Sequence, residues 1–260
     1  MRALKYIVLI SVAVSAVLSA AAAWEEKPFT QWSEKDVEKL LADSPWAGKA
    51  SITHEKAGAD LGPVPDWKVI VSVRSAAPIR QALARQQLMA GGTASPDLEA
   101  NLAAPYPRYA IAIAGIPQFY RTQLAKSAQI ATLKVKGMHI MATEASVLLF
   151  DKEGKPAQPP APASGGPGRG RQQASTGVQI VPVAQRGGGA GFGGGGGGGF
   201  GGGGFEDKSG ITATLFLEFP KSDAIAPGDG EVEVSTVIDR YQIKKSFKLK
   251  DMLYKGVLAF

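Results

Sequence analysis

Two strand-like segments in the second half of the chain flank a long stretch of unusual composition. The segment Ile211–Phe219 alternates apolar residues with Thr212, Thr214 and Glu218, which is typical of a half-buried strand. The segment Ala145–Phe150 is rich in aliphatic residues and also favours a strand. We predict that these two segments pair in one sheet.

The intervening residues, 151–208, differ sharply from both flanks. Pro156–Gly170 is rich in proline, alanine and glycine, and Gly187–Gly204 is almost entirely glycine. Such a stretch buries too little apolar surface to offset the entropy lost on ordering it. We predict a disordered insertion at 151–208 within one α+β domain formed by 24–150 and 209–260. The flanking strands can still pair, because each doubling of a flexible loop costs only ~0.6 kcal/mol.

The remaining pattern predicts alternating helices and strands before the insertion and mainly strands after it. Ser33 and Asp36 have the spacing of a helix-capping box, and Pro45 ends the short helix that follows. Ser95 and Pro96 resemble the N-cap and first position of another helix. We expect helices at 79–89, 97–102 and 119–129, and strands at 66–73, 108–114, 131–150, 231–238 and 241–249. This order predicts an α+β fold with a mainly antiparallel sheet and helices packed on one face.

The first 23 residues have the pattern of an export signal. Arg2 and Lys5 precede the apolar run Tyr6–Val17, and small residues ending at Ala23 follow. We predict a signal peptide at 1–23, cleavage after Ala23, and a secreted or periplasmic protein with no membrane span after cleavage. The alternative is an uncleaved membrane anchor, since the apolar run is only slightly shorter than the ~20 residues of a spanning helix.

The segment Gln31–Asp36, followed by Ser44–Ala47, reads QWSEKD and SPWA. It resembles the start of a set of uncharacterised secreted bacterial proteins that have no assigned activity. The resemblance implies export and nothing about mechanism.

The chain of 260 residues contains no cysteine. This excludes disulfides, thiolate nucleophiles and zinc sites that need cysteine, so the exported protein relies on its core for stability. Loss of Arg2 and Lys5 with the signal leaves 29 − 2 = 27 basic residues against 23 acidic ones, a net charge of +4. A balance this mild does not require a polyanionic partner.

Candidate catalytic residues do not form a recognisable pattern. His54 and His139 are the only histidines, and no G-x-S-x-G nucleophile motif is present. Acidic residues of the type used in glycoside hydrolysis are scattered, so that none is singled out; they are Glu144, Asp151, Glu153, Glu218 and Asp223. We therefore predict no catalytic, cofactor-binding or metal site, and no cofactor.

Two other features allow a binding interpretation and a structural one. The four tryptophans, Trp24, Trp32, Trp46 and Trp67, suit either an aromatic ligand platform or the docking of the first helix, and we favour docking. The lysines of Tyr241–Lys250 suit either an acidic partner or cross-strand pairing with Glu231 and Glu233, and we favour pairing. The glycine tract lacks the strand and helix that a dinucleotide fingerprint requires.

The short Arg/Gly segments, Gly168–Arg171 and Arg186–Gly188, with Phe192 and Phe200, are too sparse to indicate a nucleic-acid partner in an exported chain. Taken together, the sequence favours an exported, non-catalytic protein with a binding or assembly role, its partner an unknown component of the cell envelope or extracellular space. Two alternatives remain: a secreted hydrolase with a carboxylate pair, and a surface matrix or adhesion module acting through the Gly/Phe tract.

Overall fold

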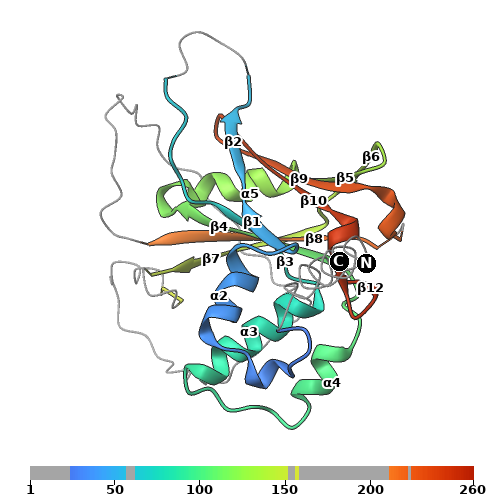
Figure 1. Ribbon diagram of the computed structural model, residues 1–260. Helices are drawn as coiled ribbons and strands as arrows, with labels where there is room; N and C mark the ends of the chain where they lie inside the picture. The colour runs from blue at the N-terminus through green and yellow to red at the C-terminus, as the bar shows by residue number, and fades with distance from the viewer. Residues whose placement is uncertain (1–23, 57–61, 152–155, 158–210, 222–223) are drawn as a thin grey trace, which may run out of the picture.

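The computed structural model describes residues 24–56, 62–151, 156–157, 211–221 and 224–260 (Figure 1). The predicted signal peptide and nearly all of the predicted insertion lie outside these residues. The helices are α2 (Glu34–Ala42), α3 (Ala77–Met89), α4 (Leu98–Ala103) and α5 (Arg121–Gln129). The strands are β1 (Ala47–Lys49), β2 (Ser51–His54), β3 (Ile70–Val73), β4 (Tyr109–Pro117), β5 (Thr132–Val135), β6 (Met138–Met141), β7 (Glu144–Phe150), β8 (Thr212–Phe219), β9 (Glu231–Ile238), β10 (Tyr241–Lys248), β11 (Leu253–Tyr254) and β12 (Val257–Leu258).

The longer strands form two five-stranded antiparallel sheets. Sheet 1 has the order β1-β3-β4-β8-β7, and sheet 2 has the order β2-β10-β9-β5-β6. The first pair of short strands joins them, because β1 lies at the edge of sheet 1 and β2, one residue later, lies at the edge of sheet 2. The α+β class and the antiparallel pairing predicted from the sequence are confirmed.

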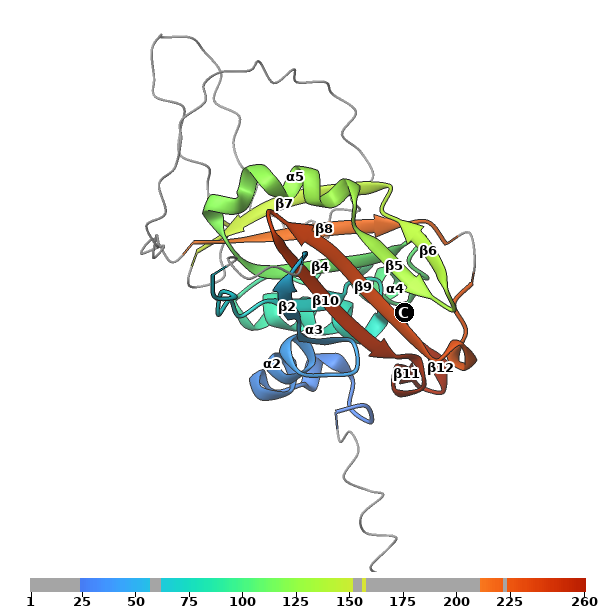
Figure 2. The ribbon, with the colours of Figure 1, turned by 90° about the horizontal axis from the view of Figure 1, so that it is seen from above.

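Helices cover both faces of sheet 1. Figures 1 and 2 show α2 and α3 on one side and α5 on the other, where α5 lies beside sheet 2. The hydroxyl of Thr236 in β9 donates a buried hydrogen bond to the carbonyl of Ser127 in α5 at 2.7 Å. Leu124 of α5 is fully buried. The sequence predicted a single sheet with helices on one face, whereas the chain builds a second sheet that packs with α5 against the opposite face.

The strands on either side of the predicted insertion pair directly. Glu144 lies opposite Glu218 and Phe150 lies opposite Thr212, with the register unbroken between them. This pairing confirms the sequence prediction. The alternation in β8 is also present, since Leu215 and Leu217 are buried on the face toward α5 and sheet 2. The polar face is not open to water, however, because Glu218 is only 4% exposed.

Helix α2 begins as the sequence predicted. The backbone N–H of Asp36 donates to Oγ of Ser33, and the N–H of Ser33 donates to a carboxylate oxygen of Asp36, which together form the capping box. The Ser33 hydroxyl also donates to this carboxylate at 2.7 Å, and this bond, with the one from the Ser33 N–H, holds the pKa of Asp36 below its ordinary value. Helix α4 differs from the prediction: it begins at Leu98 with Asp97 as N-cap and no side-chain cap, so Ser95 does not cap it.

The tryptophans divide into two groups. Trp32 and Trp46 are buried beside α2, and Trp24 packs against both rings, in line with the docking interpretation. Trp67 lies apart from them, 4.8 Å from the ring of Tyr120. The tryptophans therefore anchor two separate parts of the core.

The lysines of β10 lie across from acidic residues as predicted, but in part only. Lys248 is opposite Glu231, while Ser246 of β10 and Lys134 of β5 flank Glu233.

Among the described residues, no helix combines the length and apolar character needed to cross a bilayer.

Strand β4 bends near its end at a glycine. The pairing of β4 with β8 shifts between Ile113 and Ile116, and Gly115 between them has φ +87°. A Cβ at this position would lie 2.4 Å from the carbonyl oxygen of Lys68. Both the positive φ and the close approach of Lys68, just before β3, therefore require glycine at position 115.

Candidate functional site

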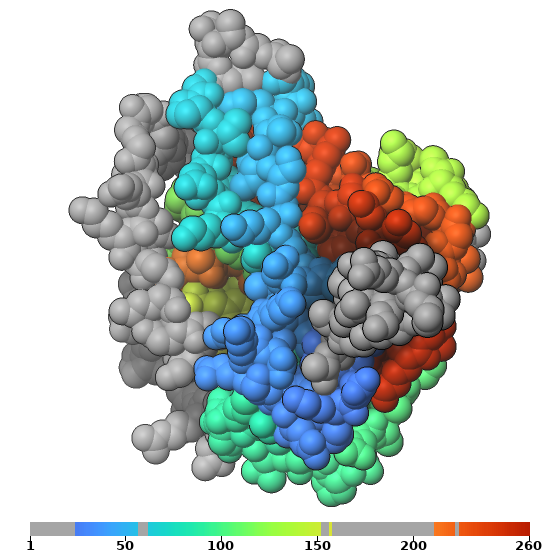
Figure 3. All heavy atoms as spheres, in the orientation of Figure 1, coloured from blue at the N-terminus to red at the C-terminus, as the bar shows by residue number. Residues whose placement is uncertain are grey.

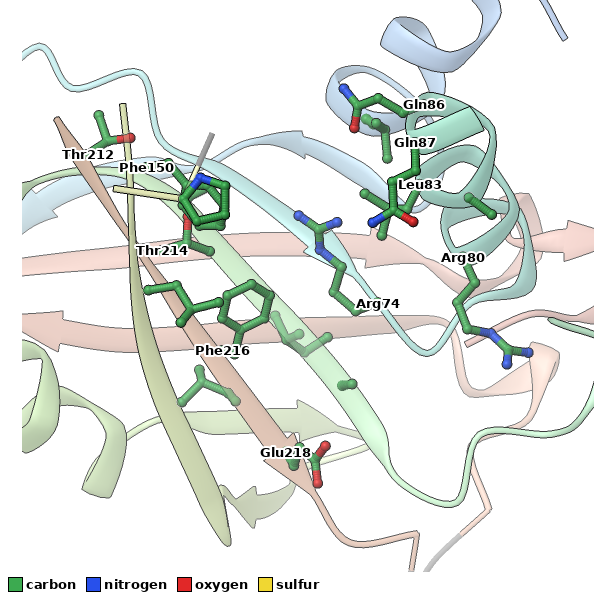
Figure 4. Close-up of a pocket in the computed structure, with 18 of the residues that line it drawn as sticks. Arg74, Arg80, Leu83, Gln86, Gln87, Phe150, Thr212, Thr214, Phe216 and Glu218 are labelled. Carbon is green, nitrogen blue, oxygen red and sulfur yellow. The ribbon is translucent and has the colours of Figure 1, made fainter. Parts of the chain in front are cut away.

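A pocket of about 690 Å³ lies between α3 and the face of sheet 1 that this helix only partly covers. We call it the α3–β8 pocket. Figure 3 shows atoms of β7 and β8 at the bottom of a recess beside the atoms of α2, and Figure 4 shows the lining residues. The size falls within the range of small-molecule binding sites, about 300–1,000 Å³.

The pocket is hollow because the central strand carries alanines on this face. In β4, Ala110, Ala112 and Ala114 point to the α3 side, while Ile111 and Ile113 point to the opposite core. A row of methyl groups leaves space between the sheet and α3 that larger side chains would fill. Ala110 and Ala114 line the pocket.

Apolar side chains form most of the remaining wall. Phe216 of β8, Leu148 and Phe150 of β7, and Leu83 of α3 all line the cavity. Leu148 is 49% exposed, so the wall formed by the edge strand is open to solvent. The seven residues from Thr212 to Glu218 on β8 give this face a length of about 20 Å.

Arg74 enters the pocket from the end of β3. Its backbone N–H donates to the carbonyl of Ala110, and Oγ of the next residue, Ser75, accepts from the N–H of Ala110, which fixes the backbone there. Figure 4 shows the Arg74 side chain directed between Phe216 and α3, away from Glu218. The guanidinium carbon is 5.9 Å from the ring centroid of Phe216.

The guanidinium of Arg74 is largely shielded from water and is paired with no acidic side chain among the described residues. Its Nε is buried and makes no hydrogen bond within the described residues. Burial lowers the pKa of Arg74 to about 10. The residue as a whole is half-buried, because part of its side chain lines the cavity.

Arg80, on the first turns of α3, differs from Arg74 in having backbone partners. Its two terminal nitrogens donate to the carbonyls of Asn101 and Ala104 at 3.2 and 2.8 Å. Figure 4 shows the Arg80 side chain turned away from the centre of the pocket. Arg80 therefore ties α3 to the segment containing α4, whereas Arg74 has no such structural bond.

A polar cluster closes one end of the pocket. Tyr106 donates to Glu218 at 3.1 Å, and Arg108 lies 2.5 Å from Glu144 and 3.5 Å from Glu218. Burial and the adjacent Glu218 carboxylate raise the pKa of Tyr106 to about 12. Glu218 therefore already has a cation and a hydrogen-bond donor beside it.

The acidic residues considered from the sequence lie in different places. Glu144 and Glu218 are brought together on adjacent strands, but the same guanidinium contacts both of them. Asp151 lines the pocket near the end of β7. Glu153 and Asp223 lie outside the described residues. A carboxylate pair exists, and Arg108 occupies the position between its members where a hydrolase would need its substrate.

The two histidines lie away from the pocket, in sheet 2. His54 in β2 has its ring 5.4 Å from that of Tyr241, and its Nε2 is 3.0 Å from the carbonyl of Gly62. His139 is exposed on β6. Within the described part of the chain, no cluster of three or more histidine, aspartate or glutamate side chains is arranged to hold a metal ion.

Sequence reasoning missed the two features that define the pocket. Arg74 follows a strand segment and has the appearance of an ordinary loop cation. The alternation Tyr-Ala-Ile-Ala-Ile-Ala at 109–114 was a usable signal, because small side chains at every second position of a central strand predict a hollow on one face.

Comparison with known protein families, with curated proteins and with solved structures found no match.

Proposed function

We propose that this chain is an exported, non-catalytic binding protein, and that the α3–β8 pocket holds a small molecule with an apolar body. The observation that carries the proposal is a cavity of about 690 Å³ whose floor is the alanine row of the central strand. A pocket built on a rigid strand and a helix keeps its shape without ligand, which reduces the entropy lost on binding.

The chemistry of the lining supports binding of an apolar body. Phe216, Leu83, Leu148 and Phe150 present carbon surface, and apolar area removed from water contributes about 25 cal/mol per Å². The nearest acidic pair, Glu144 and Glu218, is engaged by Arg108. This arrangement favours binding over the alternative of a hydrolase with a carboxylate pair.

A neutral fluorescent probe tests the proposal. N-phenyl-1-naphthylamine is apolar, uncharged and brighter in an apolar site. We expect saturable binding to the wild-type protein, and at least tenfold weaker binding to Ala114→Phe, because the new ring fills the floor of the pocket.

Ala145→Phe is the matched control. Ala145 is an exposed residue of β7 opposite Leu217, on the other face of sheet 1. This variant should bind the probe as the wild type does. Absence of saturable binding to the wild-type protein, or equal loss in both variants, would refute the pocket as the binding site.

Export is tested separately. Expression of the full chain in a bacterium, followed by N-terminal sequencing of the protein from the periplasm and medium, should give a mature chain beginning at Trp24. Retention of the complete N-terminus in the membrane fraction would favour the uncleaved anchor instead.

A further inference from the structure

The cation in the α3–β8 pocket has a position that the fold itself does not explain. Arg74 lies where β3 ends, and its neighbour on the central strand is Ala110. Beyond Ala110 in the same cross-strand row lies Glu218, which is directly paired with it. The row would allow Arg74 to reach toward Glu218, yet its side chain points the other way, into the apolar part of the cavity (Figure 4).

The acidic residue in that row is already occupied. Glu218 accepts from Tyr106 and lies 3.5 Å from Arg108. The remaining described contact of the Arg74 guanidinium is the face of Phe216, at 5.9 Å. An aromatic face stabilises a cation by about 0.5–2 kcal/mol, much less than a bidentate carboxylate offers a guanidinium.

A shielded charge without a counter-charge is costly to a folded protein. Such charges are normally paired, hydrogen-bonded or neutralised. The Nε of Arg74 is buried without a hydrogen bond, although the cavity beside it has room for a ligand. The ligand-free fold therefore carries the free-energy cost of an unpaired guanidinium. Such a cost is expected at a binding site, where a ligand of opposite charge removes it.

The surroundings of Arg74 restrict what the ligand looks like. One unpaired guanidinium matches one negative charge. Phe216, Leu83 and Leu148 provide an apolar channel that continues along β8 toward Thr212, a length of about 13 Å from the Phe216 position. A second negative charge on the ligand would find no second free guanidinium among the described lining residues, because Arg80 already donates to the carbonyls of Asn101 and Ala104.

We propose that the α3–β8 pocket binds a monoanionic amphiphile, with its carboxylate on the guanidinium of Arg74 and its unbranched apolar chain along Phe216 and Leu148. This inference rests on the proposed function and adds the charge and shape of the ligand. Arg74 acts as the specificity-determining residue, and the alanine floor accommodates the chain.

Competition against the neutral fluorophore tests the inference with three probes of equal chain length. Dodecanoate, 1-dodecanol and dodecyltrimethylammonium, each below its micelle concentration, share one apolar body and differ in head-group charge. We expect dodecanoate to displace the fluorophore from the wild-type protein at a concentration at least tenfold lower than either of the others.

Three variants separate the head-group contact from the effect of general charge. Arg74→Met should lose the preference for dodecanoate while still binding 1-dodecanol, and Arg74→Lys should keep part of it. Arg121→Met removes an equal charge from an exposed position at the start of α5, and should bind all three probes as the wild type does. Denaturation curves for each variant establish that it is folded.

The outcomes distinguish this inference from the proposed function. If 1-dodecanol competes as well as dodecanoate, or if Arg74→Met keeps the preference, the pocket binds apolar molecules but the assignment of Arg74 is refuted. If neither the fluorophore nor any amphiphile binds the wild-type protein, the proposed function itself is refuted, and this inference with it.

Discussion

Replacing Arg74 by methionine should make the ligand-free protein more stable. The change removes a shielded charge that has no acidic partner in the described part of the chain, and methionine keeps most of the aliphatic volume of the arginine stem. Residues that serve a ligand rather than the fold commonly reduce stability, and their replacement restores it at the expense of binding.

The magnitude follows from the burial of the guanidinium. A pKa of about 10 for Arg74, set against the ordinary value of arginine, corresponds to about 3 kcal/mol. Partial exposure of the residue lowers this figure, because solvent screens the charge. Loss of the contact with Phe216 subtracts about 0.5–1 kcal/mol more. We therefore expect Arg74→Met to raise the free energy of unfolding by about 1–2 kcal/mol at pH 7.

Urea denaturation of refolded, ligand-free protein measures this difference, with the buried Trp32 and Trp46 as fluorescent reporters. The urea midpoint should rise, while the slope of the free energy of unfolding against urea concentration stays unchanged.

Because burial lowers the pKa of Arg74, the folded state releases the proton of this guanidinium at a lower pH than the unfolded state does. The wild type should therefore gain stability as the pH rises above 10, and the difference should shrink.

Arg80→Met is the matched comparison on the same pocket. Arg80 donates to the carbonyls of Asn101 and Ala104, so its loss should destabilise the protein by about 1–2 kcal/mol. A wild-type protein more stable than Arg74→Met at pH 7, by 1 kcal/mol or more at the same urea dependence, would show that Arg74 holds the fold together. The unpaired charge of Arg74 would then not reduce the stability of the fold.

Three further changes have defined outcomes. Tyr106→Phe removes a hydrogen-bond donor from the buried Glu218 and should lower the free energy of unfolding by about 1–2 kcal/mol at pH 7, measured by urea denaturation. Because the pKa of Tyr106 is raised to about 12, the wild type should lose this extra stability between pH 10 and 12. A constant difference in stability across that range would contradict the role assigned to Tyr106. Gly115→Ala should lower the thermal midpoint well beyond Gly137→Ala, since both have positive φ but only the first meets a neighbouring carbonyl, and equal shifts would refute the steric argument. Ser33→Ala should cost about 1 kcal/mol through loss of the helix cap, as measured by the same denaturation, and an unchanged midpoint would count against the capping box.

Features of the fold that depend on residues close together in the chain were predictable from the sequence. The capping box needs only Ser33 and Asp36 at the right spacing, and the pairing of β7 with β8 follows from two strand patterns around a segment of contrasting composition. The second sheet was not predicted. The chain enters sheet 2 from β1 of sheet 1 through β2. Strand β1 has three residues, including Gly48, and β2 has four, so neither is long enough to show a clear alternation of apolar and polar residues.

The pocket was beyond sequence reasoning for a different reason. Arg74 becomes unusual only when β3, β4 and β8 are side by side and Phe216 faces it, which is a property of three segments far apart in the chain. The polar face of β8 had the appearance of a solvent-facing surface, whereas Tyr106 and Arg108 contact Glu218 and it is buried. Burial of a polar residue by residues distant in the chain leaves no trace in the local pattern.

Arg74 and the alanine floor of the α3–β8 pocket lie on different strands, which affects how the ligand preference can change by mutation. Ala114 pairs with Ile70, four residues before Arg74, and so lies about 13 Å from it along the sheet. Changes at sites this far apart usually combine additively. A single substitution in the alanine floor can therefore change which apolar chain the pocket accepts while the preference for a negative head group is kept. A single substitution of Arg74 can change the preferred head-group charge while the apolar chain stays the same.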